Sequence, residues 1–295
     1  MQYIGEIAAI SAALVWAVAT WIYSQFSHQF SAMHMNVVKG VTASMMMLLV
    51  LPVLPLPELS LSQNHFYVLA ISGIIGIAIG DSAYFSSLRR IGANKTLLLE
   101  SLAPPLSGVL ALVALGSTLS GQSWLGVVIT TLAVTFVVFQ PSVDNQPTSM
   151  SGIGYGLLAS VCQATGVVIS HYALVAGDVP PLLGALIRLS IGVFAVMIVI
   201  GFTERKPIKS ILTKLNGLSG RDKKWLLAAI FVGTFLALWL QQIALKHANP
   251  AIAQTLIATS PLFILIIYAF KGEMVTKKSI LGTLFALFGI SLFFL

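Results

Sequence analysis

Ten apolar runs of about 20 residues follow one another along this chain of 295 residues. An α-helix needs about 20 apolar residues to cross the hydrocarbon core of a bilayer, which is roughly 30 Å thick. The runs are apolar nearly all round, whereas buried helices of a water-soluble protein carry a polar stripe at helical spacing. We therefore predict ten transmembrane helices, at 5–24, 33–54, 65–87, 96–115, 122–140, 152–174, 182–202, 225–245, 251–270 and 279–295.

The composition excludes the main alternatives to a membrane protein. Charged residues make up 8% of the chain and apolar types 57%. So few charged residues could not cover the surface of a water-soluble protein. The net charge of +7 comes from basic residues concentrated in short connections, as in cytoplasmic loops of membrane proteins. The single cysteine, Cys162, lies in an apolar run, which excludes a disulfide framework and a thiolate metal site. We expect a multi-pass protein of the cell membrane, surrounded by the lipid bilayer, with no nucleic-acid partner, no cofactor and no metal.

The chain contains one structural unit twice. Three pairs of residues recur at a spacing of 155 or 156 residues: Tyr84 with Trp239, Asn94 with Asn249, and Pro105 with Pro261. The polar stretch Ser142–Ser151 separates the copies, at 1–141 and 151–295, and each copy holds five predicted helices. An odd number of crossings makes the second copy enter from the opposite face of the membrane. The predicted fold is an all-α integral membrane protein with ten transmembrane helices in two inverted five-helix repeats.

The longest connection, 203–224, is polar and basic, and we expect a surface loop with a short interfacial helix there. Lys and Arg are concentrated in this loop and in the alternate connections of the chain. Because such loops favour the cytoplasm, the charge bias predicts that both termini lie outside the cell.

Two cations lie within predicted helices, where a charge is costly to insert. Lys39 lies seven residues into the second helix, and Arg188 takes the matching place in the seventh. This symmetric pair could hold an anionic substrate. Alternatively, each cation bonds a backbone carbonyl or joins its helix to a neighbour, and the recurrence in both halves favours that structural role.

Asp81 lies near the end of the third predicted helix and has no counterpart in the second half, where Leu236 takes its place. Tyr84 shares its helix face. A lone acid that faces a cavity could bind a cationic group or carry a proton. The structural alternative is a salt bridge to Arg89 or Arg90.

Glu100 precedes Pro104-Pro105 by one helical turn in the fourth predicted helix. A proline frees a backbone carbonyl and interrupts the helix, as the discontinuous helices of transporters do around a midplane site. We predict substrate binding or proton coupling by Glu100, against the alternative that it is the partner of Lys39. Pro261 should cause a matching interruption in the ninth helix.

Aromatic and amide side chains in other predicted helices suit the wall of a small-metabolite pocket. They are Trp16, Gln163, Trp239, Gln241 and Gln242, and each one singly could also serve packing or helix–helix hydrogen bonding. His171 and His247 lack metal-ligand spacing. Sequence motifs for ATP hydrolysis or for common hydrolytic enzymes are also lacking.

The second half resembles the EamA-type branch of the drug/metabolite transporter superfamily at its small residues, mid-helix proline, Gly-Glu turn and closing glycines. These residues are Ala248, Pro261, Gly272-Glu273, Gly282 and Gly289. The first half is similar at Gly80-Asp81, Tyr84-Phe85, Gly92-Ala93 and Pro105, and departs at Ser117 and Lys39. The resemblance implies a secondary transporter that moves small organic metabolites such as amino acids or drugs, often outward, through a central cavity. It also implies cytoplasmic termini in many members, opposite to the charge bias here.

Our leading hypothesis is a transporter of small organic metabolites that works by alternating access, with protons as the candidate coupling ion. The predicted binding residues are Trp16, Lys39, Asp81, Tyr84, Glu100, Gln163, Arg188, Trp239 and Gln241. One alternative is transport of anions such as nucleotide sugars or phosphorylated sugars by Lys39 and Arg188. Another is an intramembrane enzyme acting on lipid, for which the sequence offers no nucleophile and base. Because one chain carries both halves, we expect a functional monomer.

Overall fold

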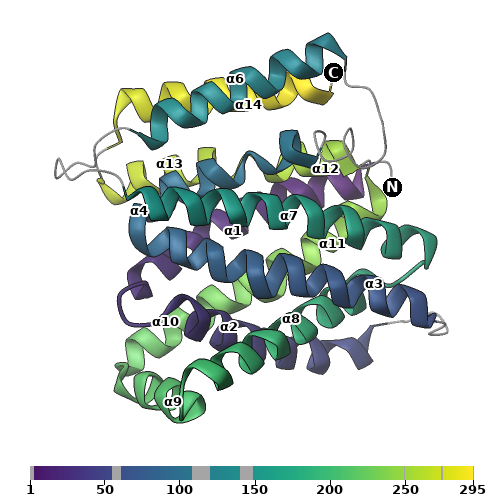
Figure 1. The fold of residues 1–295 in the computed structure, drawn as a ribbon, viewed down its shortest axis with the longest axis vertical. Helices are drawn as coiled ribbons and strands as arrows, with labels where there is room; N and C mark the ends of the chain where they lie inside the picture. The colour runs from purple at the N-terminus through teal and green to yellow at the C-terminus, as the bar shows by residue number, and fades with distance from the viewer. Residues whose placement is uncertain are drawn as a thin grey trace.

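The computed structural model describes residues 3–54, 61–107, 120–139, 149–248, 250–273 and 275–294. These residues form a bundle of helices with no β-strand among them (Figure 1). Seven helical stretches within the described ranges are long and apolar enough to cross a membrane: Ile4–Phe26, Ala32–Val53, Gln63–Glu100, Met150–Ala176, Pro181–Thr203, Gly220–His247 and Ala253–Lys271.

The α-helices are, in chain order, α1 (Ile4–Phe26), α2 (Ala32–Val50), α3 (Gln63–Gly73), α4 (Ser82–Glu100), α6 (Gly121–Val138), α7 (Met150–Ala176), α8 (Pro181–Thr203), α9 (Pro207–Gly217), α10 (Gly220–Ile230), α11 (Ala237–His247), α12 (Pro250–Ile257), α13 (Ser260–Lys271) and α14 (Lys277–Phe294). A short 3-10 helix, η1 (Leu51–Val53), extends α2. Two π-helical segments, η2 (Ile74–Asp81) and η3 (Phe231–Leu236), join α3 to α4 and α10 to α11.

The observed helices follow most of the predicted ones closely, and α9 is the short helix expected in the 203–224 loop. The predicted helix at 96–115 extends into 108–119, and the predicted boundary between the copies falls mostly in 140–148; both stretches lie outside the described residues. The start of α1 and the end of α14 lie at the same edge of the bundle (Figure 1).

The third predicted helix, 65–87, is too short. Helical structure continues from α3 through η2 and α4 as far as Gly92, where the backbone reverses with φ 77° and ψ 174°. Only glycine adopts this conformation without steric strain, because it has no Cβ. Asp81 therefore lies well inside a continuous helix and not near its last turns.

Both π segments lie in predicted helices that hold the third place in their half of the chain. A π segment uses i→i+5 hydrogen bonds and thus accommodates an extra residue in the helix, and such segments are frequent at functional sites. In this protein η2 ends at Asp81 and η3 contains Gly233. Both residues line a polar cavity inside the bundle.

Both predicted proline interruptions are present. A turn at Ser101–Leu102 separates α4 from the helical residues 103–107, and a turn at Ala258–Thr259 separates α12 from α13. Pro261 has no N–H to donate to the carbonyl of Ile257, and the Ser260 hydroxyl donates to that carbonyl at 2.7 Å instead. The interruption thus exposes no unsatisfied carbonyl at this position.

Small residues bring α7 into close contact with the helix that carries Asp81. A Cβ atom added at Gly166 would lie 3.1 Å from the Cα of Gly76, so the two backbones nearly touch. The Ser72 hydroxyl donates to the Gly166 carbonyl at 2.6 Å. Close approach of this kind is typical of helix packing in membranes, where small residues line the interface.

Helices α6 and α14 lie side by side along one edge of the bundle (Figure 1). Glycine permits their contact, because a Cβ at Gly282 would lie 2.0 Å from Cγ2 of Val137 and one at Gly289 would lie 2.6 Å from the Thr130 nitrogen. These helices are the last in their respective halves of the chain. The polar cavity lies in the main body of the bundle, among the other long helices.

Candidate functional site

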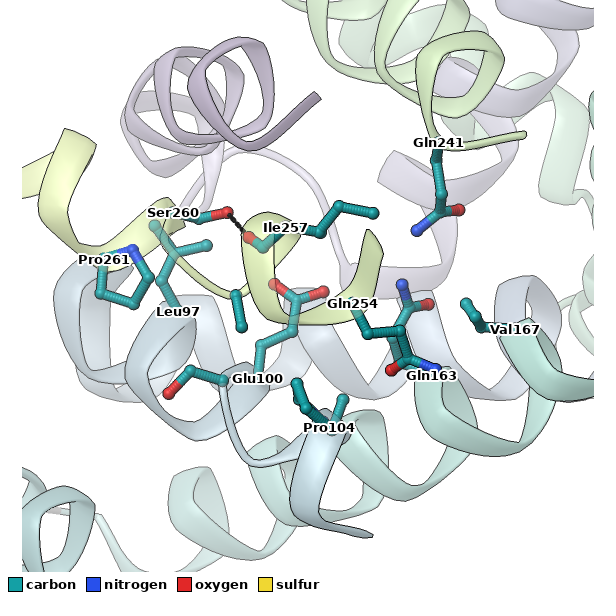
Figure 2. Close-up of a pocket in the computed structure, with 13 residues that line it drawn as sticks. Leu97, Glu100, Pro104, Gln163, Val167, Gln241, Gln254, Ile257, Ser260 and Pro261 are labelled. Carbon is teal, nitrogen blue, oxygen red and sulfur yellow. Dashed lines mark hydrogen bonds between the residues drawn. The ribbon is translucent and has the colours of Figure 1, made fainter. Parts of the chain in front are cut away.

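A polar cavity of about 50 Å³ lies between helices from both halves of the chain. It is lined by Ala12 and Trp16 of α1, Lys39 of α2, Asp81 of η2, Glu100 of α4, Gln163 of α7, Gly233 of η3, Ala237, Leu238 and Gln241 of α11, and Ile257 of α12. A second cavity of about 30 Å³ shares Glu100, Gln163, Gln241 and Ile257 with it, so the two are adjoining parts of one central site. Figure 2 shows Glu100 and three glutamines, Gln163, Gln241 and Gln254, around this second part.

Lys39 and Asp81 form a salt bridge at the wall of the cavity. The Lys39 side chain is 1% exposed and that of Asp81 is 19% exposed. The Lys39 ammonium also lies 5.4 Å from the centre of the Phe85 ring. The low dielectric of the interior makes this pairing strong, and each charge would be costly to bury alone.

The pairing excludes one of the two alternatives that the sequence left open for Asp81. Neither Arg89 nor Arg90 bonds it: the Arg90 guanidinium donates to the Ser86 carbonyl at 2.8 Å and lies 4.7 Å from the centre of the Tyr155 ring. The structural alternative, a salt bridge to Arg89 or Arg90, is not formed, because the helix continues past Asp81 and places this acid opposite α2. Lys39 joins its helix to a neighbour, as the structural alternative for the cations proposed.

Glu100 is not the partner of Lys39. Its Oε2 atom accepts a hydrogen bond from the indole N–H of Trp16 at 2.9 Å, and this bond links α1 to the end of α4. Among the described residues no cation lies within 4.0 Å of the Glu100 carboxyl group. Glu100 therefore lies in the cavity with one neutral donor identified and no counter-ion.

Six of the nine predicted binding residues line the central cavity: Trp16, Lys39, Asp81, Glu100, Gln163 and Gln241. Tyr84 lies behind them, with its ring centre 5.2 Å from that of Trp16 and its hydroxyl 2.7 Å from the Thr20 hydroxyl. Trp239 packs against Phe235, with ring centres 5.8 Å apart, and lines neither part of the site.

Arg188 is also away from the cavity lining. It is 2% exposed, and its Nε and Nη1 atoms make no hydrogen bond among the described residues. A Cβ added at Gly76 would lie 3.2 Å from its Nη2 atom, so the guanidinium packs against the glycine face of η2. Lys39 and Arg188 do not meet at a common site, although they hold matching places in the sequence.

Gln254 of α12 lines the second part of the cavity and was missed by the sequence analysis. The sequence does indicate this residue, because Gln254 is the one amide in the apolar run Pro250–Ile257. Gln242, by contrast, accepts a hydrogen bond from the Ser170 hydroxyl at 2.9 Å and joins α11 to α7 outside the cavity. His171 contacts the Leu245 carbonyl through Nδ1 at 2.8 Å, and the described residues contain no cluster of metal-ligand side chains.

Comparison with known families shows which family the chain belongs to. A model described as the EamA-like transporter family matches residues 3–139 and 150–295, nearly the whole chain. The protein belongs to the EamA-like transporter family. This confirms the resemblance predicted from the repeat residues and places the chain in the drug/metabolite transporter superfamily.

One relative of this EamA-like protein is an uncharacterised transporter of Archaeoglobus fulgidus. It is 24% identical over 288 residues, which cover 97% of this chain and 96% of the relative. A protein of known crystal structure has the same fold, with a TM-score of 0.67 at 12% identity, and the match covers 99% of this chain and 96% of that one. The EamA-like chain is thus a multi-pass membrane transporter, and these likenesses point to transport rather than to enzymatic activity.

Proposed function

We propose that this protein is a secondary transporter that moves small organic metabolites, such as amino acids or drugs, out of the cell across the cell membrane. The observation that carries the proposal is the state of Glu100, a carboxyl group in a central cavity with no counter-ion within 4.0 Å among the described residues. An acid in this position can bind the cationic group of a solute or take up a proton.

The central site has the chemical composition of a small-metabolite pocket. The Trp16 indole supplies an amphipathic wall, and Gln163, Gln241 and Gln254 supply amide groups that can donate and accept hydrogen bonds. Lys39 is already neutralised by Asp81, and Arg188 does not line the cavity. These two observations favour a cationic or zwitterionic solute over the anionic substrates of the alternative hypothesis.

We further propose ten crossings arranged as two inverted five-helix repeats, 1–141 and 151–295. Both proposed halves contribute to the cavity, the first through α1, α2, η2 and α4 and the second through α7, η3, α11 and α12. The π segments and the proline interruptions each recur at corresponding places in the two halves. A site between two such halves suits alternating access, in which one half rocks against the other.

The small volume of the site also supports alternating access. Pockets for metabolites and drugs usually measure about 300–1,000 Å³, whereas the main cavity measures about 50 Å³. In this conformation the cavity is too small to hold such a solute, and we propose that the halves separate to admit one. Because one chain supplies every residue of the site, we propose a functional monomer.

Transport into liposomes tests the proposal, with Glu100→Gln as the variant and Glu204→Gln as a control that removes an acid outside the cavity. Candidate solutes are first selected by thermal shift at two pH values; a ligand at 100 times its dissociation constant stabilises the folded state by about 2.7 kcal/mol. We expect transport of amines or amino acids, driven by a pH gradient, in the control and not in Glu100→Gln. Folded protein that moves no solute under any ion gradient would refute the proposal.

The same screen separates the alternatives. The melting temperature could rise with phosphorylated compounds only. If Lys39→Gln abolished that rise and Asp81→Asn did not change it, the protein would be an anion transporter instead. A chemically altered solute would establish an enzyme.

A further inference from the structure

A groove separate from the central cavity lies at the end of the bundle where α1 and α13 end and α10 begins. It has a volume of about 350 Å³ and is open at the surface. Its lining residues are Trp21, Ile22, Gln25 and Phe26 of α1, Arg221, Asp222 and Trp225 of α10, and Lys271 of α13. A shallower hollow of about 490 Å³ adjoins it through Arg221 and Trp225, and adds Lys224. We name Trp21, Arg221, Lys224, Trp225 and Lys271 the tryptophan–cation groove.

The cations of this groove are available to a ligand. No carboxylate of the described residues lies within 4.0 Å of Arg221, Lys224 or Lys271. The Lys271 ammonium lies 4.8 Å from the centre of the Trp21 ring. All three side chains are exposed, and among the described residues none has a carboxylate partner to give up when it binds an anion.

The two acids near the groove are already engaged in hydrogen bonds. Asp222 accepts from the Ser219 hydroxyl at 2.8 Å at the start of α10. Glu273 accepts from the indole N–H of Trp21 at 3.2 Å. With three cations against two carboxylates among the described residues, the groove keeps a net positive charge beside the rings of Trp21 and Trp225.

The position of the groove along α10 matches the boundary between lipid headgroups and acyl chains. Basic residues occupy the first turn of α10, and from Trp225 onward the exposed side chains are apolar: Trp225 is 45% exposed, Leu227 49% and Phe231 47%. Tryptophan is enriched at this level of the bilayer because its ring is apolar and its N–H is polar. Ligand phosphate held by the cations would thus lie above a lipid-facing apolar surface.

We propose that the tryptophan–cation groove binds the phosphate headgroup of an anionic phospholipid, with its acyl chains along Leu227 and Phe231. Basic pockets between transmembrane helices recognise such headgroups by charge. The groove belongs to the face with the basic loops, so the lipid is supplied by the leaflet in which anionic lipids attract basic segments. Lipid binding here is separate from the central cavity and does not depend on what that cavity transports.

Native mass spectrometry of the detergent-purified protein tests the proposal by counting bound lipids during titration with phosphatidylglycerol or phosphatidylcholine. The test variant is Arg221→Gln/Lys224→Gln/Lys271→Gln. The matched control, Arg205→Gln/Lys206→Gln/Lys209→Gln, removes the same charge from the neighbouring α9 region, where no tryptophan groove is present. Each basic residue near an anionic headgroup contributes about fivefold to affinity, so the groove variant should bind phosphatidylglycerol on the order of 100-fold more weakly.

We expect wild type and the α9 control to bind phosphatidylglycerol in preference to phosphatidylcholine, and the groove variant to lose that preference. Equal loss in both variants would show attraction by bulk charge and overturn the proposal, as would an unchanged groove variant. Glycerol phosphate is the soluble probe: if it displaces the lipid completely at the same concentration, the groove is a site for free phosphate compounds and not for a lipid. Circular dichroism and melting in phosphatidylcholine show whether each variant is folded.

Discussion

Replacing Asp81 by Asn would leave the ammonium of Lys39 buried without its counter-ion. Removing one partner of a buried ion pair costs about 3–5 kcal/mol, because the remaining charge is uncompensated. The Lys39 side chain is 1% exposed and that of Asp81 is 19% exposed, so the two single variants should differ. We expect the free energy of unfolding to fall by about 4 kcal/mol in Asp81→Asn and by about 3 kcal/mol in Lys39→Met. The second loss is smaller because the charge left unpaired, that of Asp81, is more exposed to water.

The double variant Lys39→Met/Asp81→Asn distinguishes this reasoning from simple loss of packing. With both charges removed no ion remains uncompensated, so the double variant should unfold at a higher denaturant concentration than either single variant. Equilibrium unfolding in mixed detergent micelles, followed by circular dichroism, measures the three free energies. Single variants that each lose less than about 1 kcal/mol, or a double variant that loses the sum of both, would refute the assignment of a buried, charged pair.

Three further predictions concern two glycines, at positions 166 and 92, and the ion pair between Asp178 and Lys246. Gly166→Val should destabilise the fold by about 1–3 kcal/mol because its side chain would meet the backbone of Gly76, whereas Gly154→Val on the same helix, with open space at its Cβ position, should melt like wild type. Gly92→Ala should cost about 1–3 kcal/mol in unfolding free energy, because alanine does not tolerate φ 77° with ψ 174°. The hydrogen bond from Lys246 lowers the pKa of Asp178 below 3.8, so the pair stabilises the fold above that pH and its contribution disappears as the pH falls through the lowered value. Melting curves of wild type and Asp178→Asn should therefore differ slightly at pH 7 and converge in acid; a gap that widens in acid would contradict the sign.

Local features of the sequence predicted much of the fold because their causes are local. A run of 20 apolar residues predicts a helix in lipid whatever its neighbours are, and the proline at 261 removes a backbone N–H at a known place. The end of the third helix was misplaced because the polar and basic side chains before Gly92 resemble a loop, although the structure continues the helix through them.

The sequence indicated the residue types of the candidate site but not the contacts that they make. Polar side chains in apolar runs are few, so Trp16, Glu100, Gln163 and Gln241 could be selected one by one, and the same criterion should have included Gln254. Arg188 takes the place in the sequence that matches Lys39, but its side chain packs against the glycine face of η2 and away from the cavity lining.

The sequence by itself determined that this chain lies in a membrane, where its helices begin and break, and to which family of transporters it belongs. Tertiary structure decided which polar groups meet: Lys39 with Asp81, 42 residues apart, and Trp16 with Glu100, 84 residues apart. Helix formation depends on the properties of neighbouring residues, whereas these pairings depend on how helices rotate and pack against one another. Small residues such as Gly76 and Gly166 set that packing, and their effect appears only when both helices are in place.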